Sequence, residues 1–138
     1  VDLRISGVRD TALKHGYSFM ESNVFCGSPE DLELVRRIEV IAGKTGIICA
    51  NDSTAAVLMS SLDDLGIEIS KDVLICGYDD MKYSKHLKHS LTSFRQPCEE
   101  IANISIELLM RRLKENNRIP ITVNLKGDIV IRESSQFR

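Results

Sequence analysis

The sequence predicts an α/β fold, a layered, open and mostly parallel sheet flanked by helices. Two short apolar runs, "GIICA" at 46–50 and "VLICG" at 73–77, are typical of strands that are covered on both faces. Segments 28–43 and 51–66 repeat their apolar residues at helical spacing, and each ends in a glycine suited to a helix end. Because helices alternate with buried strands, the strands are expected to pair in parallel.

Two further elements are predicted before this central part. Segment 6–15 is expected to be a helix that ends at Gly16, and segment 17–25, "YSFMESNVF", is expected to be a strand. In the helix predicted at 28–43, Ser28 is the expected N-cap.

Three elements are predicted after it. A helix at about 98–114 carries apolar residues almost all around its circumference, so it is expected to need burial on more than one side. Two short strand candidates follow, "ITVNL" at 121–125 and "DIVIRES" at 128–134.

The composition is that of a soluble globular domain. The chain has 138 residues, of which 43% are hydrophobic and 28% charged, and no apolar run approaches the roughly 20 residues that span a bilayer. The formal net charge is -2 and no stripe of Lys and Arg is present, so these residues lack the charge pattern of a DNA-binding surface. Contact with a membrane is not expected, and contact with DNA would require another segment.

The cysteines indicate a reducing compartment. Cys26, Cys49, Cys76 and Cys98 form neither a CxxC pair nor a Cys/His cluster, so no metal and no cofactor is expected. Cys49 and Cys76 lie inside the predicted buried strands, where a reduced thiol packs as a small hydrophobe. No segment resembles an export signal, and we therefore expect a cytoplasmic protein.

Polar residues follow both central strands at the point where ligands bind in open parallel sheets. Asn51 and Asp52 come directly after the first run, and Asp79 and Asp80 follow the second. Each residue also has a purely structural interpretation: Asp52 could cap the following helix, and the two later aspartates could form a turn. Taken singly, they do not establish a binding site.

Longer motifs resemble the LacI/GalR family of sugar-responsive repressors. The stretch "GIICANDSTAAVLMSSLDDLGIEISKDVLICGYDD" follows that family's order of motifs, "SLTSFRQP" at 90–97 is similar to its "PLTTVRQP", and "DIVIRESS" to its "LVVRES". Arg4 and Gly7 stand at the spacing of an "R-x-x-G" element. His89 stands where the family usually has proline and Ser93 replaces a threonine, which leaves the subfamily open.

This resemblance implies a binding site and a ligand class. Arg4 would contact the ligand, Phe25 would cover it, Asn51 or Asp52 would supply a polar contact and Asp79 a carboxylate. Such groups suit a mono- or disaccharide, because carboxylate, amide and guanidinium groups pair with hydroxyls and an aromatic face covers the apolar side of a sugar.

The resemblance also implies an architecture. Residues 1–95 would form the C-terminal lobe of a periplasmic-binding-protein-like domain, segment 96–120 would cross to a missing N-terminal lobe, and 121–138 would supply strands that return. The ligand would close the lobes and reposition a DNA-binding domain that lies outside this chain. A homodimer is expected through the helix at 51–66 and segment 83–87.

Other classes of protein remain as alternatives at this point. A solute-binding protein of a sugar uptake system shares the fold, and a receiver-type phosphoacceptor domain also carries carboxylates at strand ends. No pair of a nucleophile and a base stands out, so an enzyme is not expected.

Overall fold

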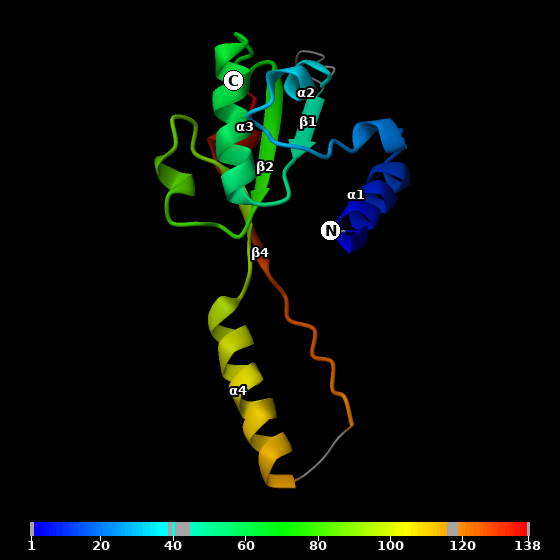
Figure 1. Ribbon diagram of the computed structural model, residues 1–138, viewed down its shortest axis with the longest axis vertical. Helices are drawn as coiled ribbons and strands as arrows, with labels where there is room; N and C mark the ends of the chain where they lie inside the picture. Colours follow the sequence, from blue (N-terminus) through cyan, green and yellow to red (C-terminus); the bar gives the residue numbers. More distant parts are fainter. Residues whose placement is uncertain (1, 39, 41–44, 116–118, 138) are drawn as a thin grey trace.

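A computed structural model describes residues 2–38, 40, 45–115 and 119–137 of the chain (Figure 1). In chain order, its elements are α1 (Asp2–Lys14), the 3-10 helix η1 (Glu21–Asn23), α2 (Leu32–Arg36), β1 (Thr45–Ile48), α3 (Asp52–Asp64), β2 (Val73–Tyr78), η2 (Ser84–His86), β3 (Thr92–Arg95), α4 (Cys98–Glu115), β4 (Asp128–Val130) and η3 (Glu133–Ser135). The sheet, α2 and α3 form a body at one end of the molecule, and α4 extends away from it (Figure 1).

The sheet has four strands in the order β1-β2-β3-β4. β1 pairs with β2 in parallel, with Ile48 opposite Cys76, and β2 pairs with β3 in parallel, with Cys76 opposite Thr92. β4 joins β3 in the antiparallel sense, with Phe94 opposite Ile129. The predicted open and mostly parallel sheet is confirmed.

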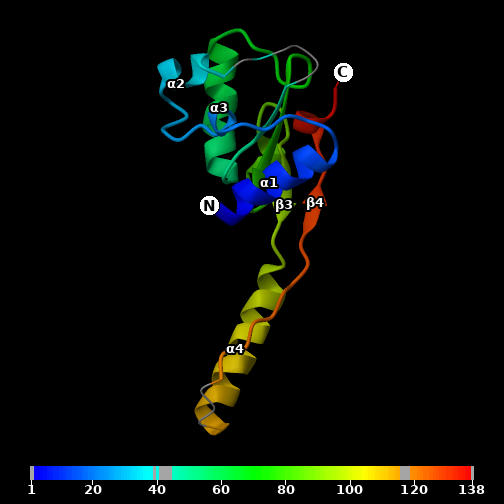
Figure 2. The same ribbon diagram turned by 90° about the vertical axis from the view of Figure 1, so that its right-hand side faces the viewer.

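Different segments cover the two faces of the sheet (Figure 2). α3, with α2 beside it, lies on one face, where Leu62 and Val73 are 0% exposed and Ile75 is 1% exposed. η3 lies on the other face, where the Ser134 hydroxyl donates to the carbonyl of Ile75 at 2.7 Å. β2 is therefore covered on both faces, as its apolar residues predict. For β1 that prediction is wrong, because this strand lies at the edge of the sheet and Ile48 is 61% exposed.

Helix α3 confirms the predicted stripe. Ala55, Leu58 and Leu62 are buried, and the chain leaves the helix through Gly66 at a φ of 77°, the left-handed region that glycine adopts without strain. Met59 lies on the same buried side, with 6% of its surface exposed, and belongs to the core.

The strand predicted at 17–25 is wrong. Asn23 accepts a hydrogen bond from the backbone N–H of Met20 at 2.7 Å, and this local bond closes the turn of η1 instead of leaving the backbone extended. The side chains of Tyr17 and Met20 are 70% and 61% exposed, so no burial compensates for opening that turn.

The helix predicted at 28–43 is shorter than expected. α2 begins at Leu32, and Asp31 is its N-cap in place of Ser28, accepting from the N–H groups of Glu33 and Leu34. The helix ends at Arg36, before a run rich in β-branched residues that lose side-chain freedom in a helix. Residues 39 and 41–43 of the predicted helix lie outside the described residues.

The last helix matches its prediction, whereas one strand candidate does not. α4 projects from the body (Figures 1 and 2), and Ile101 and Leu113 on it are 39% and 70% exposed. Segment 121–125 is not a strand, because it runs beside α4 beyond the end of the sheet, with no described strand next to it. Within the described residues, no helix has both the length and the hydropathy needed to cross a bilayer.

Candidate functional site

The ends of β1 and β2 and the first turns of α1 meet at one edge of the sheet. Because β1 and β2 run in parallel, Asn51 and Asp79, which follow them, lie at the same edge. Arg4 of α1 reaches this edge: its Nη1 donates to the carbonyl of Ala50 at 2.5 Å, and its guanidinium lies 4.7 Å from the centroid of the Tyr78 ring. The structure thus brings together Arg4, Asn51 and Asp79, while their contact with a ligand stays a prediction.

Asn51 is the N-cap of α3. Its Oδ1 accepts from the backbone N–H of Thr54 at 2.8 Å and from the hydroxyl of Ser53 at 2.8 Å. Capping satisfies a backbone donor that the first helical turn would otherwise leave unpaired. The amide nitrogen of Asn51 takes no part in the cap, so it can donate to a ligand at the edge of the sheet.

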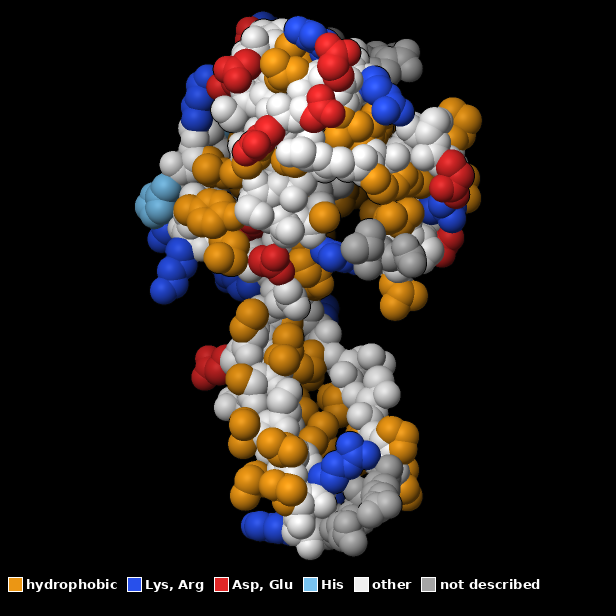
Figure 3. Space-filling view, in the orientation of Figure 1, with side chains coloured by type: hydrophobic (Ala, Val, Ile, Leu, Met, Phe, Trp, Pro, Cys, Tyr) orange, Lys and Arg blue, Asp and Glu red, His pale blue; other side chains and the backbone are white. Residues whose placement is uncertain are grey.

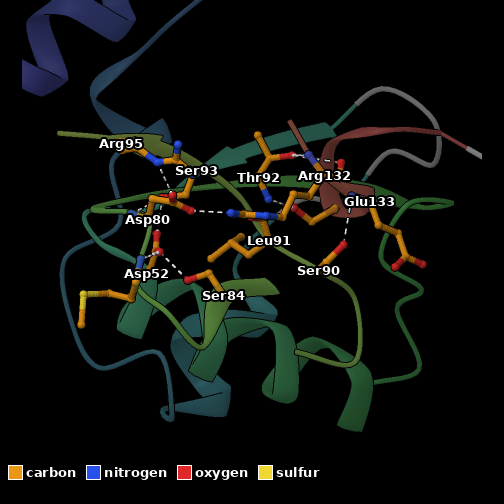
Figure 4. Close-up of polar contacts among 12 residues, drawn as sticks. Asp52, Asp80, Ser84, Ser90, Leu91, Thr92, Ser93, Arg95, Arg132 and Glu133 are labelled. Atoms are coloured by element: carbon orange, nitrogen blue, oxygen red, sulfur yellow. Dashed lines mark hydrogen bonds and ion pairs between the residues drawn. The ribbon is translucent and has the colours of Figure 1, made fainter. Parts of the chain in front are cut away.

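Asp52 is placed quite differently from its neighbour. Its side chain is 0% exposed. Oδ2 accepts from the N–H of Met81 at 2.8 Å and from the Ser84 hydroxyl at 2.5 Å, and Oδ1 accepts from the Ser93 hydroxyl at 2.5 Å (Figure 4). A β-carbon on Gly77 would collide with Oδ1 of Asp52, which explains the glycine at that point of β2. Of the two alternatives after β1, Asn51 is therefore the residue that a ligand can reach.

Asp79 and Asp80 form the turn that leaves β2. Asp79 has a φ of 104°, its N–H donates to the carbonyl of Phe94 at 2.9 Å, and its Oδ1 accepts from the amide of Gln96 at 2.6 Å. Asp79 is half-buried, and its Oδ2 is not used by the bond to Gln96. A carboxylate in this state can accept from the hydroxyl of a small ligand.

Asp80 makes ion pairs inside the chain. Oδ1 accepts from Arg132 at 2.6 Å and Oδ2 from Arg95 at 2.6 Å (Figure 4), and the Asp80 side chain is only 7% exposed. Burial raises the pKa of this carboxyl, but the hydrogen bonds and positive charges of Arg132 and Arg95 outweigh that effect, so the pKa lies below its usual range. Asp80 is therefore ionised and already paired at neutral pH.

An aromatic pair that the sequence did not single out stands beside these polar groups. The rings of Tyr78 and Phe94 stack with centroids 5.0 Å apart and an interplanar angle of 21°. They line a groove of about 350 Å³, whose other walls include Ile104 and Leu108 of α4 and segment 123–127. The position of Tyr78 in "GYDD", directly before the candidate carboxylate, is the signal that could have found it.

Phe25 is also a predicted site residue, but no described contact joins it to Arg4, Asn51 or Asp79. It does not end a strand; it lies in the loop between η1 and α2, with 38% of its surface exposed. Its proposed role as an aromatic cover rests on the resemblance alone.

All four cysteines are free thiols, and they differ in accessibility. Cys26 and Cys98 are exposed, whereas burial raises the pKa of Cys49 to about 12, with smaller contributions from Cys76 and Asp52. Because the thiolate is the reacting form, iodoacetamide at about pH 8 is expected to modify Cys49 roughly a thousand times more slowly than Cys26. Peptide mass spectrometry over a time course measures both rates, and equal rates would contradict the placement of Cys49.

Among the described residues, no group of His, Cys, Asp and Glu could hold a metal ion.

The geometry agrees with a known family. Residues 1–135 match the model of the periplasmic binding protein-like domain. Since the match extends over almost the entire chain, the chain belongs to the family of periplasmic binding protein-like domains.

Its relatives are regulators of the LacI/GalR type, which confirms the resemblance found in the sequence. The transcriptional regulator GalR of Escherichia coli K12 is 27% identical over 136 residues, which is 96% of this chain and 39% of GalR. The chain spans only 27% to 39% of the length of curated relatives of this kind. These relatives are transcription regulators, in agreement with the expectation that the chain is not an enzyme.

Solved structures give the same fold. The complex of the transcriptional regulator CelR with cellobiose superposes with a TM-score of 0.82 at 24% identity, over 96% of this chain and 42% of that one. A LacI family regulator from Enterococcus faecium with bound ribose has a TM-score of 0.60 at 29% identity, over 68% of this chain and 35% of that one.

Proposed function

We propose that this chain is the C-terminal lobe of the effector-binding domain of a cytoplasmic bacterial transcription regulator, and that its effector is a mono- or disaccharide. The observation that carries the proposal is the meeting of Arg4, Asn51 and Asp79 at one edge of the sheet, beside the Tyr78 ring. Family membership and the sugars bound by CelR and by the Enterococcus regulator support it.

The chemistry of this edge suits a sugar. Asp79 accepts from hydroxyls, the amide nitrogen of Asn51 donates to them, and the guanidinium of Arg4 supplies a planar set of donors. The Tyr78 and Phe94 rings offer an apolar wall for the carbon face of the sugar, and Phe25 would cover its other side. Asp52 is fully buried and does not contact the ligand. It supports the site through its hydrogen bonds to Met81, Ser84 and Ser93.

The second wall of the cleft would come from another lobe. We assign residues 1–95 to the C-terminal lobe, 96–120 to a crossing segment and helix of the N-terminal lobe, and 121–138 to the return. Two observations support this division: α4 stands clear of the sheet, and exposed hydrophobic side chains gather along it (Figure 3). Closure of the lobes around the sugar would move a DNA-binding domain that is not part of these residues.

The intact regulator is proposed to be a homodimer. The contact surface would combine α3 with the loop at 83–87, where the side chain of Tyr83 is 38% exposed. An isologous contact of this kind places the same surface on both subunits. Light scattering of the intact protein tests it, and a monomeric mass at micromolar concentration would contradict it.

Calorimetric titration of the intact regulator tests the ligand class. The panel contains ribose, galactose, cellobiose and sucrose, with a sugar phosphate and a purine base for comparison. A neutral sugar is expected to bind once per chain and to change the affinity of the protein for a DNA fragment selected from a random library. Binding of the phosphate or the purine alone would overturn the sugar assignment. Sugar binding without any effect on DNA would indicate the solute-binding alternative.

A further inference from the structure

The turn after β2 holds its backbone in an unusual conformation at two successive residues. Asp79 has a φ of 104° and Asp80 a φ of 50°, in the region that side chains other than glycine rarely adopt. Such a conformation persists only where the surroundings determine it, and it is concentrated at binding sites and switch regions. The contacts that hold this turn therefore indicate its functional role.

One set of contacts anchors the turn to the body. The N–H of Asp80 donates to the Ser93 hydroxyl at 3.0 Å, and that hydroxyl donates to the buried Asp52. Asp52 also accepts from the N–H of Met81, the next residue of the turn. These bonds fix the backbone from the side of α3, and they do not use the carboxylate of Asp80.

The carboxylate of Asp80 makes a second set of contacts, with the end of β3 and with the residues that follow β4. Arg95 is the last residue of β3, shortly before α4, and Arg132 follows β4, on the chain returning from it. Asp80 pairs with both guanidinium groups at 2.6 Å (Figure 4). Arg95 lies where β3 leads out of the body toward α4, opposite Asp128 of β4. Arg132 lies beyond the inner end of β4, where its Nη1 also donates to the carbonyl of Leu91 at 2.6 Å. A single carboxylate therefore joins the strand that leads to α4 and the strand that returns from it.

The two aspartates thus face different parts of the molecule. Asp79 carries the carboxylate of the candidate site, and its Oδ1 accepts from Gln96, which directly follows Arg95. Because Asp79 and Asp80 share one constrained turn, a shift of Asp79 toward a ligand must be accommodated at the ion pairs of Asp80.

We propose that Asp80 is a positioning residue that couples ligand contact at Asp79 to β3 and β4, the strands that lead to α4 and return from it. Asp80 does not touch the ligand. It holds Arg95 and Arg132 through its ion pairs. Binding of a ligand at Asp79 therefore reduces the motion of segments 92–97 and 128–132. This inference rests on the proposed sugar-binding function.

The test is hydrogen exchange on the intact regulator with Asp80→Asn, with and without saturating ribose, galactose, cellobiose or sucrose. In the wild-type protein, the sugar that binds is expected to slow exchange in segments 92–97 and 128–132 about 10-fold, within the usual range of coupling between sites. In Asp80→Asn the same sugar is expected to bind with a dissociation constant raised by less than about 10-fold, while its effect on exchange falls below about 2-fold. A residue that only stabilised the fold would not separate the two readouts.

The control is Glu68→Gln, which removes one carboxylate charge and an exposed ion pair to Lys71 far from the site and is expected to behave like the wild type. If Asp80→Asn fails to fold, Arg95→Gln replaces it, because the Arg95 side chain is 57% exposed and only one of the two ion pairs of Asp80 is lost. A wild-type response to sugar in either variant that folds would overturn the inference. A wild-type protein that binds none of the four sugars would overturn the proposed function itself.

Discussion

Replacement of Asp52 by alanine is expected to lower the free energy of unfolding of this lobe by about 3 to 5 kcal/mol. The carboxylate is fully buried and accepts hydrogen bonds from Met81, Ser84 and Ser93. Its removal leaves these donors without an acceptor in the protein interior, and each buried unsatisfied group costs about 1 to 3 kcal/mol. Urea unfolding of the intact regulator, followed by circular dichroism, measures the change.

Two further variants separate the hydrogen bonds from the volume of the side chain. Asp52→Asn preserves the shape but turns one acceptor into a donor, so we expect a loss of about 2 kcal/mol, between the wild type and the alanine variant. Glu68→Ala, at an exposed ion pair, is expected to stay within about 0.5 kcal/mol of the wild type. A loss of less than 1 kcal/mol in Asp52→Ala would mean that water or a neighbouring side chain replaces the carboxylate.

The central layer of the fold could be predicted because apolar strands and an amphipathic helix leave strong patterns in the sequence. β1 and β2 are almost continuously apolar, α3 carries a stripe every three or four residues, and Gly66 ends that helix at a positive φ. These features are local, and the packing of α3 on β2 agrees with them. The tertiary contacts of β2 and α3 agree with the strand and the helix that these local features predict.

The errors occur where the outcome depends on a competition between local bonds. Segment 17–25 contains aromatic and β-branched residues typical of a strand, yet one hydrogen bond that the Asn23 side chain accepts from the N–H of Met20 selects a turn. At α2, Ser28 and Asp31 are both good N-caps, and the choice between them depends on how the preceding loop approaches the body. Such differences amount to about 1 kcal/mol, which residue types alone do not resolve.

The sequence predicted where the candidate site lies more completely than it predicted which contacts each of its residues makes. Parallel strands bring Asn51 and Asp79 to one edge, and the sequence order already implies this. The difference between Asn51 and Asp52 does not follow from sequence, because it depends on which side chain points into the body toward Ser84 and Ser93. The ion pairs of Asp80 depend on Arg132, which is 52 residues away along the chain.

Substitution of Asp79 by asparagine is expected to weaken binding of the sugar by about 10-fold to 100-fold in the intact regulator, because a hydrogen bond to a charged group contributes about 1.5 to 3 kcal/mol. Asparagine is chosen because it tolerates a left-handed backbone, and Asp79 has a φ of 104°. The fold should therefore survive, with a change in the free energy of unfolding below about 1 kcal/mol. Calorimetric titration with ribose, galactose, cellobiose and sucrose measures the affinity, and Glu68→Gln is the matched control for the loss of one charge. If Asp79→Asn binds the sugar as tightly as that control does, the carboxylate does not contact the ligand, and the site must be sought along the groove lined by Phe94 and Leu108.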